Sequence, residues 1–466
     1  MLALLAAAQG IIALDATIVF VAIPSIASEL EYSRQTVQWV VSAYTITFGG
    51  FLLLGGRLAD VLGNRRMFIA GQALFSVASL AAGLANGGAL LIGARAVQGV
   101  GAAILFPATL ATLNAWFEEG PARLRALAVW STASVAGLAL GALLGGLLTQ
   151  WFSWRAIFLV NVPIASGCAL MAIRWLPRDG RSVSVTDIDF GGGIVATCAG
   201  TLLVLSIVEA PDLGWLSLPV VATLCVAAAL LVTLWQIEKR VKIPLIPWNI
   251  ISNQGLQLVM LLTVIFMGSF GAQYYFLSLY YQEVYAYTTL QAGLAFLVPT
   301  AVCAAGIRLS ERVVSRTGVG SALRYGFVAG ACGIVLIRFA LPTGYLSLLP
   351  GLCLSSVSQG LVWTAMWALA ARGVPDEEQG ITSGIASTAQ QIGGALVLAA
   401  QVAASNVGLN GLTGDALRRG LAEGIERVIT GMAILALVGA VASLAADHVG
   451  RKSRSAASRA GDSTLG

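Results

Sequence analysis

Two charged residues lie deep inside apolar stretches of this chain, Asp15 in the first stretch and Arg95 in a later one. Each such group costs about 2.5–3.5 kcal/mol at the centre of a bilayer on insertion scales, and residues that carry this cost usually face a cavity or a partner. A carboxyl group in that setting can take a proton from one side of a membrane and release it to the other, and a nearby cation opposes protonation. We therefore predict that Asp15 and Arg95 handle a proton, with structural hydrogen bonding as the alternative for both.

Few other residues offer chemistry. The six cysteines lie within apolar runs without a C-x-x-C pair, and the one histidine is His448, near the C-terminus. Metal binding and histidine-based catalysis therefore find little support, and no G-x-x-x-x-G-K-[ST] motif for nucleotide binding occurs. We expect no cofactor, no metal and no nucleic-acid partner, and we expect that the chain is not an enzyme.

Composition indicates that membrane helices must position the two charges. Hydrophobic residues make up 58% of the 466 residues and charged residues 11%, against about 25% charged residues in a typical soluble protein. Breaks at charges, Gly/Pro clusters and polar patches predict an all-α integral membrane protein with fourteen spans of about 20 residues each. With the N-terminus in the cytoplasm, twenty of the 27 Lys and Arg residues fall on the cytoplasmic side and six outside, which places both termini in the cytoplasm.

A repeated connection predicts how these spans are grouped. Residues 56–66 and residues 306–318 both carry Gly, Arg-Leu, an acid, basic residues and Gly, on the same side of the membrane. They lie eight spans apart, so two related six-span halves would be separated by two extra spans, and internal repeats of this kind are common in secondary transporters. The predicted parts are an N-terminal six-helix bundle (1–175), two inserted helices with linkers (176–250), a C-terminal six-helix bundle (251–447) and a basic cytoplasmic tail (448–466).

The first copy of this connection is the most specific motif in the chain. Seven of its residues match the pattern G-x-L-A-D-x-x-G-x-[RK]-[RK]: Gly56, Leu58, Ala59, Asp60, Gly63, Arg65 and Arg66. The pattern resembles the signature loop between spans 2 and 3 of the major facilitator superfamily. The resemblance implies a gating loop in which Asp60, with Arg65 and Arg66, helps to hold the cytoplasmic ends of two halves in one state. The alternative is an ordinary cytoplasmic turn.

Three further stretches resemble the fourteen-span drug:proton antiporter branch of that family. Leu14–Pro24 is similar to L-D-x-T-I-V-N-V-A-L-P, with Phe20 in place of the asparagine, Arg95–Ala103 to R-x-x-Q-G-x-G-A, and Trp154–Pro163 to W-R-x-I-F-x-x-N-x-P. The matches cover the first 163 residues densely and the second half mainly in layout. The resemblance implies a secondary active transporter that exports hydrophobic or amphipathic compounds, such as drugs and antibiotics, in exchange for protons. A dedicated exporter of one endogenous metabolite, antibiotic or lipid is the alternative.

Glycines and polar residues within the spans complete the candidate site. Gly137, Gly141, Gly145 and Gly146 resemble the branch's motif G-x-x-x-G-P-x-x-G-G, with Ala142 in place of its proline. Their spacing of four puts three of them on one helix face, where a neighbouring helix can approach closely. Seven polar or aromatic residues could line a substrate cavity: Tyr44, Gln98, Trp130, Gln273, Gln282, Gln359 and Trp363. As a set they favour amphipathic, partly aromatic substrates.

The remaining expectations concern the setting of the protein. The span pattern predicts a multi-pass protein of the plasma (inner) membrane, surrounded by lipid and monomeric. Family members usually carry a short cytoplasmic tail before the first span, whereas the first basic residue here is Arg34. We therefore expect that the reading frame begins upstream of Met1.

Overall fold

The computed structural model describes residues 1–30, 34–118, 120–179, 190–239, 253–372, 374, 379–409 and 413–446. Helices make up most of these residues and no strand occurs among them, which confirms the all-α prediction. Twelve helices in the described part are long and apolar enough to cross a membrane, and Gly192–Ile207 forms a shorter apolar helix. The number of fourteen spans therefore stays a prediction.

A first group of helices surrounds one common interior. It consists of α1 (Leu2–Glu29), α2 (Arg34–Leu62), α3 (Asn64–Gly83), α4 (Gly88–Trp116), α5 (Pro121–Trp151), α6 (Ala156–Leu159) and α7 (Asn161–Trp175). Helix α1 packs along α5, and α4 packs against both α2 and α3. Further contacts of α7 with α1 and α3 close the group around the space that Asp15 occupies.

A second group follows later in the chain. It consists of α11 (Gln254–Phe266), η2 (Met267–Gly271), α12 (Gln273–Leu279), η3 (Tyr280–Val284), α13 (Thr289–Ala295), α14 (Leu297–Thr317), α15 (Val319–Ala340), η4 (Leu341–Thr343), α16 (Tyr345–Ala370), α17 (Gln379–Ser405) and α18 (Gly414–Ala442). Helix α16 packs against α14 and α15, and α18 packs against α15. The π-helical turn η2 separates α11 from α12, and a second π-helical turn, η3, follows α12.

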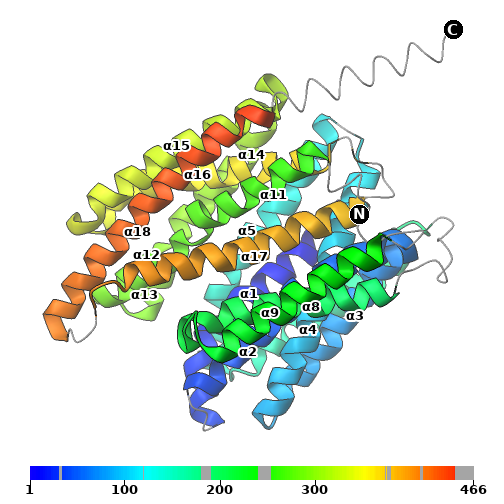
Figure 1. Ribbon diagram of the computed structural model, residues 1–466, viewed down its shortest axis with the longest axis horizontal. Coiled ribbons are helices and arrows are strands. Elements are labelled where there is room, and N and C mark those ends of the chain that lie inside the picture. Colours follow the sequence, from blue (N-terminus) through cyan, green and yellow to red (C-terminus); the bar gives the residue numbers. More distant parts are fainter. Residues whose placement is uncertain are drawn as a thin grey trace.

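Helices α8 (Phe190–Leu213) and α9 (Leu218–Glu238) pack against each other beside these groups. Helix α8 contacts α2 of the first group and α17 of the second, and much of α9 is exposed (Figure 1). The pair therefore lies at the side of the junction. The four predicted domain limits stay predictions, and the tail 448–466, with His448, lies outside the described residues.

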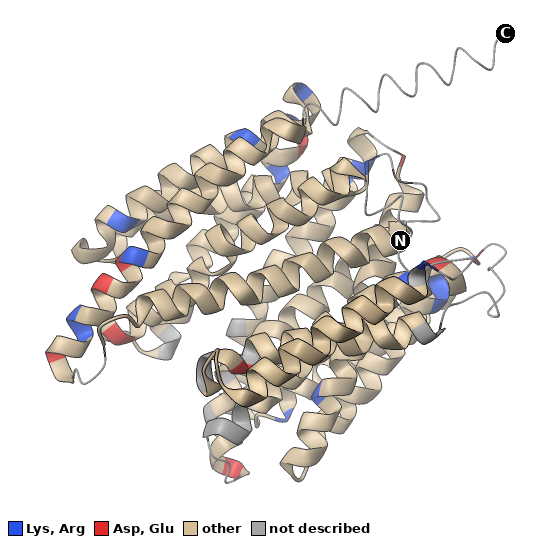
Figure 2. Cartoon of the chain, viewed as in Figure 1, with Lys and Arg blue, Asp and Glu red and all other residues tan. Residues whose placement is uncertain are grey.

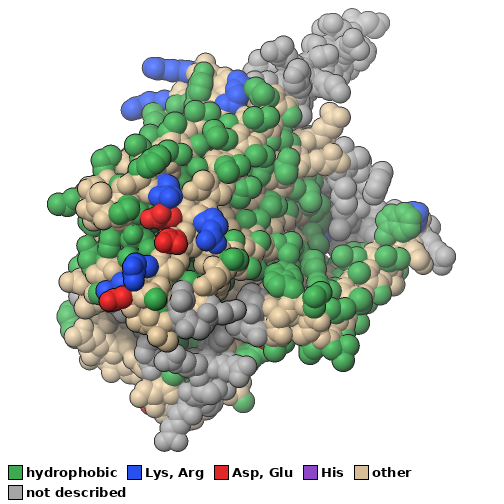
Figure 3. All heavy atoms as spheres, turned by 60° about the vertical axis from the view of Figure 1, so that its left-hand side comes forward, with side chains coloured by type: hydrophobic (Ala, Val, Ile, Leu, Met, Phe, Trp, Pro, Cys, Tyr) green, Lys and Arg blue, Asp and Glu red, His purple; other side chains and the backbone are tan. Residues whose placement is uncertain are grey.

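The two groups meet along two seams. Helix α2 packs against α17, and α5 packs against α14 (Figure 1). Figure 2 shows charged residues mostly toward the helix ends, and Figure 3 shows hydrophobic side chains spread over much of one outer face. This distribution fits helices whose outer surfaces face hydrocarbon and whose ends reach water.

The two repeated connections share one geometry. Gly63 alone separates α2 from α3, with a φ of +99°, and Gly318 alone separates α14 from α15, with a φ of +86°. Glycine adopts this left-handed backbone at no steric cost. The predicted loop is a one-residue turn in the structure: Gly56 and Asp60 lie within the end of α2, and the arginine pair lies in the first turn of α3. The gating role of these residues stays a prediction.

Candidate functional site

Asp15 lies at the centre of a buried ionic cluster in the first group of helices. Its Oδ2 accepts a hydrogen bond from Arg95 Nη1 at 2.6 Å. Its Oδ1 accepts one from Gln98 Nε2 at 2.9 Å and one from Asn161 Nδ2 at 2.8 Å. These residues are at most 1% exposed, and a charge buried this deeply is tolerated when it is paired and hydrogen-bonded. The structure thus brings together the two charges that the sequence singled out.

Arg95 has partners besides Asp15. Its Nε donates to the carbonyl oxygen of Val40 at 2.9 Å, and its Nη1 also donates to Gln98 Oε1 at 2.7 Å. The guanidinium carbon lies 4.4 Å from the centre of the Tyr44 ring, a cation–π contact. Arg95 is therefore also hydrogen-bonded to α2 and within α4.

Gln98, predicted to line a substrate cavity, belongs to this cluster, and the ring of Tyr44, also predicted to line that cavity, packs against Arg95. Gln98 also donates to Ser79 Oγ at 2.8 Å. Both the oxygen and the nitrogen of its amide are therefore hydrogen-bonded within the protein. We call Asp15, Ser79, Arg95, Gln98 and Asn161 the Asp15 cluster. Its members come from α1, α3, α4 and α7, so its geometry depends on how these helices pack.

Glycines set the close approach of α5 to α1, the helix that carries Asp15. A Cβ atom at Gly137 would overlap the carbonyl oxygen of Gly10, and one at Gly141 would overlap the Leu14 carbonyl and the Thr17 hydroxyl. Thr17 Oγ1 also donates across the seam to the carbonyl oxygen of Leu138 at 2.9 Å. The motif glycines at 137 and 141 therefore act by helix packing next to Asp15.

Gly141→Ala is expected to destabilise the protein. The added methyl group meets backbone atoms of α1, which cannot move as a side chain could, and overpacking of this kind costs about 1–3 kcal/mol. We expect a lower midpoint of thermal unfolding in detergent for Gly141→Ala. Gly93→Ala is the matched control, because nothing lies within 4 Å of its added Cβ. Equal midpoints for the two variants would contradict the packing role of Gly141.

Polar contacts join the two groups at the ends that are predicted to be cytoplasmic. Asp60 Oδ2 accepts a hydrogen bond from the backbone N–H of Ile381, at the beginning of α17, at 2.7 Å. Asn114 Nδ2 donates to Gln379 Oε1 at 3.0 Å. At the other seam, Arg125 lies 3.8 Å from Glu311. We call these three contacts the inner closure; they join the two groups at the end predicted to be cytoplasmic.

The arginines of the same motif bond within their own group. Asp179, just after α7, accepts hydrogen bonds from the backbone N–H groups of Arg65 at 2.9 Å and Arg66 at 3.1 Å. The Arg65 guanidinium donates to the carbonyl oxygen of Ile173 at 2.6 Å. Because α3 starts directly after Gly63, its first N–H groups face Asp179. Of the predicted gating residues, Asp60 is the one whose hydrogen bond here crosses between the groups.

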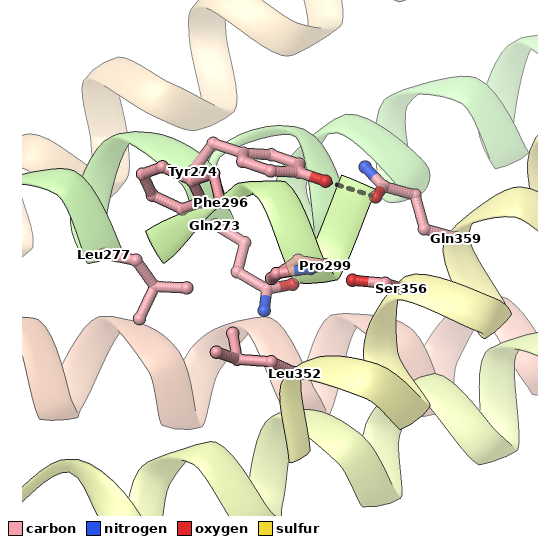
Figure 4. Close-up of a pocket in the computed structure, with 8 residues that line it drawn as sticks. All are labelled: Gln273, Tyr274, Leu277, Phe296, Pro299, Leu352, Ser356 and Gln359. Atoms are coloured by element: carbon pink, nitrogen blue, oxygen red, sulfur yellow. Dashed lines mark hydrogen bonds between the residues drawn. The ribbon is translucent and has the colours of Figure 1, made fainter. Parts of the chain in front are cut away.

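A polar pocket lies in the second group of helices. Eight residues line it, and none is charged: Gln273, Tyr274, Leu277, Phe296, Pro299, Leu352, Ser356 and Gln359 (Figure 4). The Tyr274 hydroxyl donates to Gln359 Oε1 at 3.1 Å. The π-helical turns η2 and η3 flank α12, which supplies three lining residues, and such turns are frequent at functional sites.

The other predicted cavity residues lie elsewhere. Gln282 is exposed, and its amide donates to Ser278 Oγ at 3.0 Å on its own helix. Trp130 and Trp363 belong to a set of rings between the two groups. We call this set the aromatic cluster: Phe106, Trp130, Phe266, Trp363 and Trp367, with neighbouring ring centres 5.4–6.3 Å apart.

The aromatic cluster reaches the Asp15 cluster through two further rings. Phe48 lies 6.2 Å from Phe106, and Tyr44 stacks on Phe48 at 5.8 Å. Tyr44 in turn lies beneath the guanidinium of Arg95. A continuous path of packed groups therefore connects the buried ion pair with the junction of the two groups.

The predicted outer end of the first group has its own ionic contact. Glu29, at the end of α1, pairs with Arg155 and accepts a hydrogen bond from the Trp154 indole N–H at 2.6 Å. Arg155 also donates to the carbonyl oxygen of Ala85 at 3.2 Å and lies over the Trp154 ring. The hydrogen bond from Arg155, more than any other contact, lowers the pKa of Glu29 from its ordinary value of 4.5. The W-R pair of the third motif thus ties α1 to the start of the sixth span.

This contact predicts a pH dependence of stability. A carboxyl group whose pKa is lower in the folded protein contributes stability above its unfolded pKa and loses it as the pH falls through the folded pKa. Wild-type protein should therefore unfold at a higher temperature than Glu29→Gln at pH 7, and the difference should shrink below about pH 4.5. Thermal unfolding at a series of pH values measures this. A difference that stays constant down to pH 3 would show that the charge of Glu29 plays no part.

Several residues of these sites are hard to find in the sequence. Asn161 lies in a recognised motif, but its spacing from Asp15 gives no sign that the two side chains meet. Asp179 and Gln379 lie beside helix ends in polar segments that resemble any connection. Tyr274 and Ser356 become notable only when α12 and α16 are seen to face one pocket (Figure 4).

Two helix groups joined at one end, with a buried ion pair in one and an uncharged polar pocket in the other, define a membrane transport protein built from two halves. Residues 5–398 match the model of the Major Facilitator Superfamily. The chain belongs to this family, whose members are transporters rather than enzymes. The family resemblance seen in the motifs is thereby confirmed.

Relatives of known name are similar over most of their length. The chain is 36% identical over 417 residues to the cephamycin export protein CmcT of Amycolatopsis lactamdurans, which covers 88% of this chain and 85% of that protein. It is 37% identical over 407 residues to the puromycin resistance protein pur8 of Streptomyces alboniger, with 85% and 80% covered. The names of both relatives refer to antibiotic export or antibiotic resistance.

Solved structures share the fold at low sequence identity. The human organic anion transporter MFSD10 (TETRAN) aligns with a TM-score of 0.67 at 15% identity, over 95% of this chain and 98% of that one. A bacterial homologue of the iron transporter ferroportin, in an outward-facing state, aligns with a TM-score of 0.67 at 13% identity, over 96% and 98%. At these identities the likeness concerns the fold alone.

Proposed function

We propose that this protein is a secondary active transporter that exports hydrophobic or amphipathic small molecules across the plasma membrane in exchange for protons. The observation that carries the proposal is the fully buried carboxylate of Asp15, paired with Arg95 in the interior of one half. Relatives named for cephamycin export and puromycin resistance support export of small organic compounds. In this proposal both termini are cytoplasmic, and a single chain in the lipid bilayer is the working unit.

The Asp15 cluster supplies the proton step. In the ionised state Asp15 holds Arg95, Gln98 and Asn161 around itself. Protonation removes the negative charge, so the attraction to Arg95 weakens, while Arg95 retains its bonds to Val40 and Gln98. The bundle then has two arrangements of similar energy, and a proton selects between them. Moving one charge through 100 mV releases about 2.3 kcal/mol, which sets the scale of the work available per proton.

The inner closure supplies the step that exposes the transport path to one side. With Asp60 bonded to the start of α17, the two halves are joined at the end that we assign to the cytoplasm. Export requires that these contacts open to admit a substrate and close to release it outward. The rings from Tyr44 to Trp130 lie between the ion pair and this closure, so they are the packed groups through which protonation would act on it.

A dedicated exporter of one metabolite is the second candidate. It is favoured by the relative named as a cephamycin export protein, whose name gives a single class of antibiotic. A resistance screen of cells that produce this protein separates the two candidates. Protection against many unrelated compounds supports broad export, whereas protection against one compound, or none, supports a dedicated exporter.

The direct test uses purified protein in liposomes with an imposed pH gradient. A panel of cationic, neutral and anionic compounds, with puromycin among them, is offered in the medium that stands for the cytoplasm. We expect transport of at least one compound against its gradient, and we expect it to stop when the pH gradient is collapsed. Transport that continues unchanged when a gradient of sodium or another ion replaces the pH gradient would contradict proton coupling.

A further inference from the structure

We propose that the aromatic cluster is a substrate-binding site that recognises aromatic compounds carrying hydrogen-bond acceptors such as carbonyl, nitro or ether oxygens. Its indole N–H groups would be the donors, exposed when the inner closure opens. This inference rests on the proposed function, because a site between the halves has a use only if the halves part. It adds the chemical class of the substrate and the groups that recognise it.

The first observation is a set of buried donors without acceptors. The indole Nε1 atoms of Trp130, Trp363 and Trp367 are all buried and have no hydrogen-bond partner in this conformation. Trp130 is 0% exposed and Trp367 is 1% exposed. A buried donor that lacks an acceptor costs stability, and each such group calls for an explanation. Packing alone calls for a large ring at these positions and does not require an N–H group.

The second observation is where these donors lie. Trp130 belongs to α5 of one half and Trp367 to α16 of the other, and their ring centres are 6.3 Å apart. When the two halves part at this end, the two indole rings must separate. Their N–H groups then become accessible to a molecule that enters between the halves. Donors that are unused in the closed state thus become available in the state that admits the substrate.

The third observation links this site to the polar pocket. Gln359, Trp363 and Trp367 recur every four residues on α16, so they lie on one face of that helix. Gln359 lines the pocket, and Trp363 lies next to Trp367 with ring centres 5.8 Å apart. One helix face therefore runs from the junction of the halves to the pocket, carrying indole and amide donors in sequence.

The composition of this face sets the substrate class. The aromatic cluster and the eight residues that line the pocket contain no Asp, Glu, Lys or Arg side chain. A cationic group would find no carboxylate there, whereas rings would stack and acceptor oxygens would meet N–H groups. The nearest buried carboxylate in the path of rings is Asp15, which is engaged by Arg95.

The test is equilibrium binding to purified protein, which needs no gradient and no flux. Two radiolabelled probes are compared. Chloramphenicol is aromatic, uncharged and rich in acceptor oxygens, whereas tetraphenylphosphonium is an aromatic cation without a hydrogen-bond acceptor. The variants Trp130→Phe and Trp367→Phe keep a ring and lose the N–H group. Trp235→Phe, on the exposed side of α9, is the matched control.

We expect wild-type protein and Trp235→Phe to bind chloramphenicol equally. Trp130→Phe and Trp367→Phe should each weaken chloramphenicol binding about fivefold, the factor expected for one net hydrogen bond, and leave tetraphenylphosphonium binding within about twofold. Retained tetraphenylphosphonium binding also shows that each variant is folded. The proposal is overturned if wild-type protein does not bind chloramphenicol, if both probes weaken alike, or if neither does.

Failure of this inference differs from failure of the proposed function. If pH-driven export is found but the tryptophan variants bind both probes normally, the donors are not a substrate site and the export function stands. If the variants lose chloramphenicol binding as expected while no compound is exported, the binding site stands and the proposed export function is wrong.

Discussion

Replacing Asp15 by asparagine is expected to reduce pH-driven export to the level of protein-free liposomes. Asparagine keeps the size of the side chain but carries no negative charge and cannot gain or lose a proton. In the Asp15 cluster the variant resembles the protonated state permanently, so the exchange of a proton for a substrate cannot be completed. Transport by purified protein in liposomes with an imposed pH gradient measures this loss.

A control is needed because Asp15→Asn also leaves Arg95 buried without its counter-ion. Removing one member of a buried ion pair costs about 3–5 kcal/mol, so a loss of transport could reflect a loss of folded protein. Asp15→Asn combined with Arg95→Gln removes both charges and should recover much of the thermal stability without recovering pH-driven transport. If Asp15→Asn pumps at the wild-type rate with the wild-type pH dependence, Asp15 is structural. The next candidates are then two other carboxyl groups in predicted spans, Glu209 in α8 and Glu283 in η3.

Replacing Asp60 by asparagine is expected to shift the protein toward the state that is open to the cytoplasm and to slow export. Asp60 accepts a hydrogen bond from the first turn of α17, where the positive end of the helix dipole favours a negative charge. Such a charge contributes about 1 kcal/mol, which changes the balance of two states about fivefold. Labelling of a cysteine placed at the inner closure, together with flux, measures both effects.

Asp179→Asn is the matched control for this experiment. Asp179 also accepts hydrogen bonds from the first turn of a helix, but that helix, α3, belongs to its own half. The control should lower thermal stability without changing cytoplasmic labelling. Wild-type flux and wild-type labelling in Asp60→Asn would reduce this motif to a topology signal.

The sequence was most informative where one residue type by itself signals a large free-energy cost or a special backbone conformation. Asp15 and Arg95 stand out because a charge in an apolar stretch needs a partner, and each proved to be the partner of the other. Gly63 and Gly318 stand out because a tight helical hairpin needs glycine, and both form the same one-residue turn. These features depend on residue type and local spacing, which a sequence displays directly.

The sequence did not predict which side chains far apart along the chain would contact each other. Gln98 and Tyr44 were predicted to line a cavity because they are polar groups in spans. In the structure Gln98 belongs to the Asp15 cluster, and the Tyr44 ring packs against Arg95. Gln282 resembles Gln273 in type and lies on the same span, but one lies exposed and the other lines the pocket. The π-helical turns η2 and η3 change which side of this span each residue faces. We found no local sequence pattern that predicts them.

Proton release on substrate binding tests the central claim most directly. Purified protein in weakly buffered detergent solution near neutral pH is titrated with a compound that wild-type protein exports, and a pH-sensitive dye records released protons. Wild-type protein should release protons in step with binding, and Asp15→Asn should bind the compound and release none. Equal proton release from Asp15→Asn and wild-type protein would contradict the assignment of the coupled proton to Asp15.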